Sequence, residues 1–195
     1  MKILAFETTD AVASVALYLD GETDQTVIET DRRHAESVLP AAESLLERHG
    51  LVTADMDAFA ADVGPGSFTG VRIGVCMANA LGAAHNKPVV AVNALEILAH
   101  PYADETVCAL IDARNGNGYG ALYRNGDVLK PPCACVIDAF LSELPENCRM
   151  VGTATDDPKL PAAIDAALIA AKRTGEKEIS PLYLKLSQAE RMWNA

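Results

Sequence analysis

Paired metal ligands are missing from this sequence. Its five cysteines include no Cys-x-x-Cys pair, and its four histidines include no His-x-x-x-His pair. Structural zinc sites and helical metal sites need such spacings. We therefore predict no metal site, and thiols that are buried in a reducing compartment. Cys133 and Cys135 would share one face of a strand, which leaves a metal or redox pair there as the alternative.

The sequence also lacks a long apolar run and is short of basic residues. No apolar stretch reaches the roughly 18 residues that a membrane-spanning helix needs, and a strand-like run follows Met1-Lys2 directly, so we expect a cytoplasmic protein with no membrane contact. Its 16 Lys and Arg residues against 27 Asp and Glu residues give a net charge of −11. Such a chain repels nucleic-acid phosphates, so any contact with RNA is expected to depend on a partner. Ordinary solubility is the alternative explanation of the charge.

Both common nucleotide-binding signatures are absent from the glycine-rich stretch Gly64–Gly74. No lysine follows the glycines as a Walker loop requires, and Gly70 comes one residue too late for the dinucleotide fingerprint. The stretch predicts a turn between a strand and a helix. Two interpretations stay open: the first amides of the helix could hold an anion, or small residues at every fourth position could let another backbone approach closely. These small residues are Gly66, Gly70, Gly74, Ala78 and Gly82.

Apolar periodicity predicts alternating strands and helices, the pattern of an α/β protein. Asp20-Gly21 is typical of a hairpin turn. Pro40 is expected to kink the helix that contains it, and Asn93 is expected to cap another helix. The expected strands cover residues 3–6, 13–19, 26–29, 58–63, 89–92 and 150–154, and the expected helices cover residues 35–48, 70–84, 94–100 and 160–173.

An internal repeat relates the two halves of the chain. A shift of 105 residues places Leu4–Gly21 on Ala109–Gly126, with Glu7 on Asp112. A hairpin whose first strand ends at an acid therefore occurs twice. This predicts two lobes of related design, with Glu7 and Asp112 facing one another across a cleft; chance similarity of two hairpins is the alternative.

Such a duplicated chain resembles the actin, sugar-kinase and Hsp70 (ASKHA) superfamily. Within it, several motifs taken together resemble the bacterial TsaB (YeaZ) family. They are Ile3–Thr9, Arg33-His34, Leu39-Pro40, Gly64–Gly74, Ile111–Arg114 and Pro181–Leu184. The resemblance implies an α/β, ASKHA-like, duplicated two-lobe fold, with residues 1–100 as the N-terminal lobe and residues 101–195 as a smaller, shortened C-terminal lobe.

The same resemblance implies a scaffold rather than an enzyme. Members of the TsaB family support threonylcarbamoylation of the adenosine beside the tRNA anticodon. They act through heterodimerisation with the catalytic subunit TsaD, and the ATPase TsaE completes the machinery. For this chain it implies no catalytic residue, no cofactor, contact with tRNA only through the complex, and a possible homodimer when TsaD is absent. A small-molecule kinase or ATPase of the same fold is the alternative, and a metal-dependent peptidase lacks its ligands.

Two sets of residues follow as candidates. We expect the helices around 35–48 and 70–84 to form an apolar surface that TsaD or a second copy completes. Glu7 is one methylene longer than the usual aspartate, so the inter-lobe cleft is expected to be a vestigial nucleotide site. The partner-binding candidates are Arg33, His34, Val38, Leu39, Ala42, Val71, Arg72, Val75 and Asn79, and the cleft candidates are Glu7, Thr8, Thr9, Asp112 and Arg114.

Overall fold

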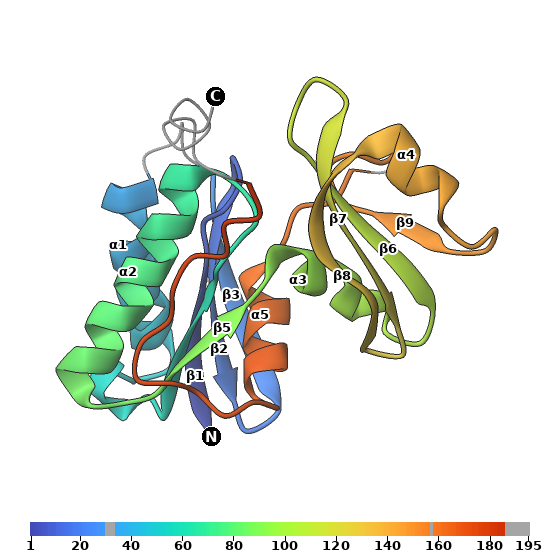
Figure 1. Ribbon diagram of the computed structural model, residues 1–195. Helices are drawn as coiled ribbons and strands as arrows, with labels where there is room; N and C mark the ends of the chain where they lie inside the picture. Colours follow the sequence, from blue (N-terminus) through green and yellow to red (C-terminus); the bar gives the residue numbers. More distant parts are fainter. Residues whose placement is uncertain (30–33, 157, 186–195) are drawn as a thin grey trace.

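The apolar runs of the sequence form two β-sheets with helices against them (Figure 1). The computed structural model describes residues 1–29, 34–156 and 158–185, without the side chain of His34. The first sheet has the strand order β3-β2-β1-β4-β5; β2 is antiparallel to β1 and β3, and β4 is parallel to β1 and β5. Its strands are β1 (Lys2–Glu7), β2 (Ala13–Leu19), β3 (Glu22–Ile28), β4 (Ala58–Asp62) and β5 (Val89–Val92).

The predicted three-stranded antiparallel start is confirmed, although its third strand is longer than expected. Asp20 and Gly21 both have positive φ, at 50° and 107°, and make a tight turn. Because this turn is complete within two residues, β3 begins at Glu22 rather than at residue 26.

Helices cover both faces of the first sheet. Figure 1 shows α1 (His34–Arg48, with Pro40 inside it) and α2 (Phe68–His85) on one face and α5 (Ala163–Ala170) on the other. Successive β1 side chains point to opposite faces, so Leu4 packs with α1 and α2 while Ile3 packs with α5. None of the helices within the described residues has both the length and the apolar character of a membrane span.

The second sheet has four strands in the order β8-β7-β6-β9. α3 (Ala94–Ala99) packs on one of its faces and α4 (Ile137–Ser142) on the other. The predicted cap of α3 is confirmed, because Asn93 Oδ1 accepts a hydrogen bond of 2.9 Å from the Glu96 amide. The strands are β6 (Thr106–Asp112), β7 (Asn117–Arg124), β8 (Asp127–Val136) and β9 (Arg149–Val151), and short 3₁₀ turns lie at Thr53–Asp55 and His100–Tyr102.

Cys133 and Cys135 share one face of β8, as their spacing predicts. Each thiol donates a weak hydrogen bond of 3.6 Å to a carbonyl of β7, beside Cys108 and Cys148 in the cluster under α4. Burial raises the pKa of Cys108 to about 12 and also raises the pKa of Cys135 and Cys148, which makes these thiols poor nucleophiles. The described residues contain no cluster of three or more side chains that could hold a metal.

The two predicted hairpins differ by one residue in register. Glu7 pairs with Ser14 in the first hairpin, whereas Asp112 pairs with Gly118 in the second. An ungapped shift of 105 residues would place Tyr119 opposite Asp112. The repeat therefore holds for each first strand, and the second turn is one residue shorter.

α5 follows the second sheet in the sequence but packs against the first. Its first amides find partners on that sheet: the Ala163 amide donates to Ser14 Oγ at 2.9 Å, and the Ile164 amide donates to Gln25 Oε1 at 3.3 Å. No side chain of its own caps α5, so these contacts replace the cap. The division of the chain into residues 1–100 and 101–195 stays a prediction. α5 belongs to the second range by its position in the sequence, but it packs on the sheet of the first range.

Ser14→Ala tests this long-range cap. The substitution leaves the buried Ala163 amide without an acceptor, so we expect the free energy of unfolding in urea to fall by about 1–3 kcal/mol. Ser44→Ala, at an exposed position of α1, is the control and should change it by less than about 0.5 kcal/mol. Equal stability of the two variants would show that the cap contributes nothing.

Candidate functional site

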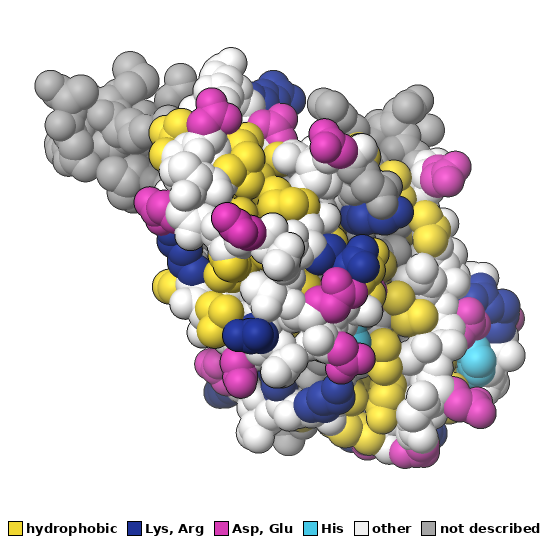
Figure 2. All heavy atoms as spheres, turned by 90° about the vertical axis from the view of Figure 1, so that its right-hand side faces the viewer, with side chains coloured by type: hydrophobic (Ala, Val, Ile, Leu, Met, Phe, Trp, Pro, Cys, Tyr) yellow, Lys and Arg dark blue, Asp and Glu magenta, His cyan; other side chains and the backbone are white. Residues whose placement is uncertain are grey.

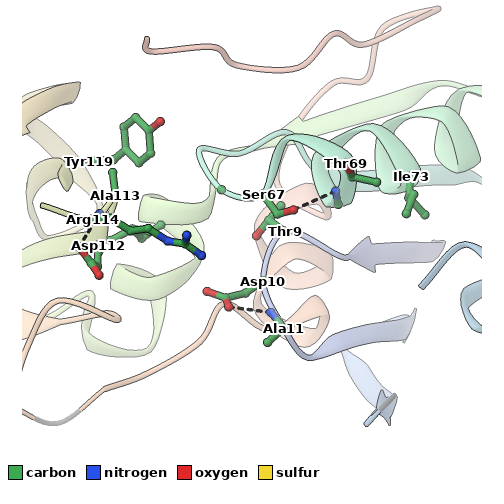
Figure 3. Close-up of a pocket in the computed structure, with 13 residues that line it drawn as sticks. Thr9, Asp10, Ala11, Ser67, Thr69, Ile73, Asp112, Ala113, Arg114 and Tyr119 are labelled. Carbon is green, nitrogen blue, oxygen red and sulfur yellow. Dashed lines mark hydrogen bonds between the residues drawn. The ribbon is translucent and has the colours of Figure 1, made fainter. Parts of the chain in front are cut away.

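A cleft of about 610 Å³ lies between the two lobes (Figure 3). Three chain segments line it: the turn after β1, the start of α2, and the turn after β6. The lining residues are Thr9, Asp10, Ala11, Gly66, Ser67, Thr69, Gly70, Ile73, Ile111, Asp112, Ala113, Arg114 and Tyr119. The two hairpin turns that the sequence relates to one another thus meet at one site.

Thr8 fixes the start of α2 against the end of β1. Its Oγ1 donates to the Gly70 carbonyl at 2.7 Å and accepts from the Gly74 amide at 3.1 Å. A Cβ on Gly70 would lie 2.0 Å from the Thr8 carbonyl oxygen, and a Cβ on Gly74 would lie 2.8 Å from Thr8 Oγ1. The close-packing interpretation of the glycine stripe is therefore confirmed. The Ser67 amide, which donates to the Thr9 carbonyl at 2.7 Å, adds a further contact.

Glu7 does not reach the cleft. Its side chain is 0% exposed, and its Oε1 accepts hydrogen bonds from the Thr9 amide at 2.6 Å and the Thr9 hydroxyl at 2.7 Å. Asp112 is exposed and lines the cleft. The two acids therefore do not face one another, because Glu7 points into the protein beneath Thr9. Its Oε2 accepts no hydrogen bond from any of the described residues.

Asp62, at the end of β4, shares this buried position with Glu7. Its Oδ2 lies 3.1 Å from the Thr9 hydroxyl, and its Oδ1 accepts from the Gly64 amide at 2.7 Å. Burial raises the pKa of Asp62 to about 7. Burial, and then the charge of Asp62, raises the pKa of Glu7 well above its ordinary value, which favours the protonated form of its carboxyl. The sequence analysis missed Asp62, although an acid that ends the apolar run Ala58–Ala61 is a readable signal.

The second lobe contributes exposed polar groups to the cleft. The Asp112 amide donates to the Thr153 hydroxyl at 2.9 Å, and Asp112 Oδ1 accepts from the Arg114 amide at 2.8 Å. Figure 3 shows the Arg114 side chain reaching into the cleft, toward the turn that carries Asp10. Histidine, cysteine and lysine do not occur among the lining residues. The cleft therefore offers hydroxyls, one guanidinium and the carboxylates of Asp10 and Asp112 to a polar ligand.

Several partner-binding candidates lie in the core rather than on the surface. Val38, Ala42, Val71 and Val75 are buried between the first sheet and the two helices. Asn79 makes two hydrogen bonds to the backbone of Ile179, at 2.9 and 3.0 Å. Leu39 is half-buried and Arg72 is exposed. Arg33 and the His34 side chain lie outside the described residues.

A second side of α2, next to its glycines, is also covered: Val71 and Val75 are buried there, and Asn79 bonds to Ile179 of the segment after α5. This segment pairs with Val89 through Glu176, and its Leu182 amide donates to the Val63 carbonyl at 2.7 Å. α1 packs against α2 as well. α2 therefore has two buried stripes. What remains exposed is a third, nearly uncharged stripe, formed by Arg72, Cys76, Ala80, Ala83 and Ala84.

The negative net charge is spread out on the face of the second lobe. Figure 2 shows acidic and basic side chains interspersed there, with apolar atoms between them. Val128, Leu129 and Val136 of β8 are about half exposed. This face is therefore not one continuous acidic surface.

Comparisons with known proteins identify the family. A family model described as TsaD, tRNA N6-adenosine threonylcarbamoyltransferase, matches residues 26–172, well over half of the chain. The tRNA threonylcarbamoyladenosine biosynthesis protein TsaB of Escherichia coli is 36% identical over 131 residues, which are 65% of this chain and 57% of that protein. TsaB of Bacillus subtilis is 28% identical over 225 residues, covering 99% of this chain and 98% of that protein. The chain belongs to the TsaB (YeaZ) family.

Solved structures agree with this family membership. A crystal structure of an uncharacterized Pseudomonas aeruginosa protein with similarity to peptidase YEAZ is 28% identical, with a TM-score of 0.81 over 94% of this chain and 99% of that chain. YeaZ from Pseudomonas aeruginosa is 27% identical, with a TM-score of 0.75 over the same shares. The predicted ASKHA-like α/β fold of the TsaB family is confirmed. The match to E. coli TsaB spans little more than half of that relative.

Glu7→Gln tests the buried carboxyl pair of this TsaB-family chain. An acid whose pKa is raised in the folded state contributes stability below its unfolded pKa of about 4.5, and this stability is lost as the pH rises toward the folded value. Glu7 and Asp62 therefore make the wild-type protein less stable at pH 8 than at pH 5. We expect Glu7→Gln to gain about 1 kcal/mol or more, relative to the wild type, between these two pH values in urea unfolding.

Glu43→Gln, at an exposed position of α1, is the matched control and should show no such pH-dependent gain. The interpretation fails if the stability difference between Glu7→Gln and the wild type is the same at both pH values.

Proposed function

We propose that this chain is a non-catalytic subunit required for threonylcarbamoylation of the adenosine beside the tRNA anticodon. It acts by forming a heterodimer with a TsaD-like catalytic subunit, and a TsaE-like ATPase completes the system. The proposal rests on membership of the TsaB family, whose curated relatives are named for tRNA threonylcarbamoyladenosine biosynthesis. Contact with tRNA occurs through the complex, in keeping with the net charge of −11.

The exposed stripe of α2 supports this proposal from the side of the structure. An 18-residue helix with a single Lys, Arg, Asp or Glu residue is unusual on a protein surface, where charged residues normally cover the outer face. Small side chains such as Cys76, Ala80 and Ala84 let a second helix approach closely. Half-buried Ile73 and Met77 flank this stripe and add apolar area. We assign the stripe as the main contact with the catalytic subunit, or with a second copy when that subunit is absent.

A kinase or ATPase remains the second candidate because of the cleft. Its volume of about 610 Å³, the start of α2 and Arg114 would suit a polar ligand. The buried position of Glu7 counts against it, because a carboxyl that points into the core cannot hold a magnesium-bound water in the cleft.

Reconstitution with TsaD, TsaE and the enzyme that supplies threonylcarbamoyl-adenylate tests the proposed function. We expect tRNA modification to require this chain, and we expect the chain alone to turn over no ATP. Mass spectrometry of the digested tRNA measures the first and phosphate release measures the second. ATP turnover by the chain alone would favour the kinase or ATPase instead.

Ala80→Asp tests the surface. A carboxylate in the middle of the uncharged stripe should weaken binding to TsaD at least about tenfold, because it loses water without gaining a partner. Ala139→Asp, at an exposed position of α4, is the control and should bind like the wild type. Val75→Asp is unsuitable, since Val75 is buried and the charge would unfold the protein. Unchanged affinity of Ala80→Asp would place the interface elsewhere.

A further inference from the structure

Two aromatic rings hold an arginine at the start of the exposed stripe. The guanidinium carbon of Arg72 lies 3.8 Å from the centre of the Phe68 ring and 6.0 Å from the centre of the Tyr183 ring. Arg72 Nε donates a hydrogen bond of 2.9 Å to the Tyr183 hydroxyl. The two rings stack with their centres 5.5 Å apart and their planes at 28°. Phe68 is 51% exposed and Tyr183 is 50% exposed, so the cluster forms part of the surface.

Arg72 contacts no carboxylate within the described part of the chain. Other arginines do: Arg48 pairs with Asp24 at 3.0 Å, Arg149 pairs with Glu105 at 3.0 Å, and Arg173 pairs with Glu96. Arg72 is also the single Lys, Arg, Asp or Glu residue of α2. Among the described residues, Arg72 is therefore a cation that contacts two aromatic rings and no carboxylate.

This arrangement prepares Arg72 to bind a carboxylate. Nε of Arg72 already donates to the Tyr183 hydroxyl. The two terminal nitrogens of the guanidinium can therefore donate to both oxygens of one carboxylate. Stacking restricts the side chain before any partner arrives, which lowers the entropy lost on binding. The exposed parts of both rings offer apolar area around the charge, the composition of a binding hot spot.

We propose that the Phe68–Arg72–Tyr183 cluster is the polar anchor of the α2 surface and receives an aspartate or glutamate of the catalytic partner protein. This inference rests on the proposed function. Arg72 continues directly into the stripe of Cys76, Ala80 and Ala84, at intervals of four residues along one face of the helix. The stripe supplies close packing, and the cluster fixes the position of the partner along α2.

A protein carboxylate suits the cluster better than an RNA phosphate does. RNA binding usually depends on several cations that follow the backbone, whereas the rest of α2 carries no Lys or Arg. The two half-exposed rings and the alanines of the stripe add apolar area next to Arg72, which favours a protein partner that buries area around one ion pair.

Titration calorimetry with the TsaD protein of the same organism tests the proposal. Arg72→Gln should weaken binding about 30-fold. Arg72→Lys should recover only part of the loss, because lysine keeps the charge but not the bidentate geometry. Arg124→Gln is the matched control; it removes an exposed arginine of β7 and should bind like the wild type. Thermal unfolding establishes that each variant folds, as expected for exposed positions.

Charge reversal identifies the partner group. Arg72→Glu should abolish binding, and replacement of one aspartate or glutamate of TsaD by lysine should restore it. If the wild-type chain does not bind TsaD, both this proposal and the proposed function are wrong. If the wild type binds and Arg72→Gln binds equally well, the proposed function stands and the anchor is wrong.

Two further results would also overturn the anchor. One is the failure of every acidic substitution in TsaD to restore binding of Arg72→Glu. The other is loss of tRNA binding in Arg72→Gln with unchanged affinity for TsaD, which would identify a phosphate as the ligand.

Discussion

The contact between the end of β1 and the start of α2 is the constraint on which the rest of this structure depends. The Thr8 side chain packs against the first turns of α2, where its hydroxyl bonds to the Gly70 carbonyl and the Gly74 amide. No residue with a Cβ fits at Gly70, because that atom would lie 2.0 Å from the Thr8 carbonyl. This contact sets the height and direction of α2 over the sheet, and therefore decides which of its side chains reach solvent.

The same contact explains why an acid can be buried at the end of β1. Glu7 is fully buried, and its carboxyl turns back to the amide and hydroxyl of Thr9. Asp62 completes the arrangement through the Thr9 hydroxyl and the Gly64 amide. Two neighbouring carboxyls would repel if both ionised, and this repulsion adds to burial in raising the pKa of Glu7. The buried carboxyls of Glu7 and Asp62 thus hold the end of β1 to the end of β4 beneath the cleft.

The sequence predicted the order of most elements, because apolar periodicity and the Asp20-Gly21 turn are local signals, but it did not predict β8 or α4. It also predicted that Thr9, Asp112 and Arg114 lie near one cleft, through the repeated hairpins. It could not predict which side of α2 is exposed. That depends on residues about 100 positions away, where Ile179 bonds to Asn79 and covers a second apolar side. The burial of Glu7 was unpredictable for the same reason, since it follows from packing of a distant helix.

Because α2 is covered on two sides, little of its surface can contact another protein. The sheet covers the glycine side and the segment after α5 covers the side of Asn79, so among the described residues one narrow stripe of α2 stays exposed. A narrow stripe of small side chains allows close packing. It does not fix the position of a partner along the helix, because repeated alanines offer the same contacts at each turn. A fixed charge at one end removes that ambiguity. The segment that covers the second side also supplies Tyr183, which bonds to Arg72, so one stretch of chain both narrows the stripe and orients the charge at its end.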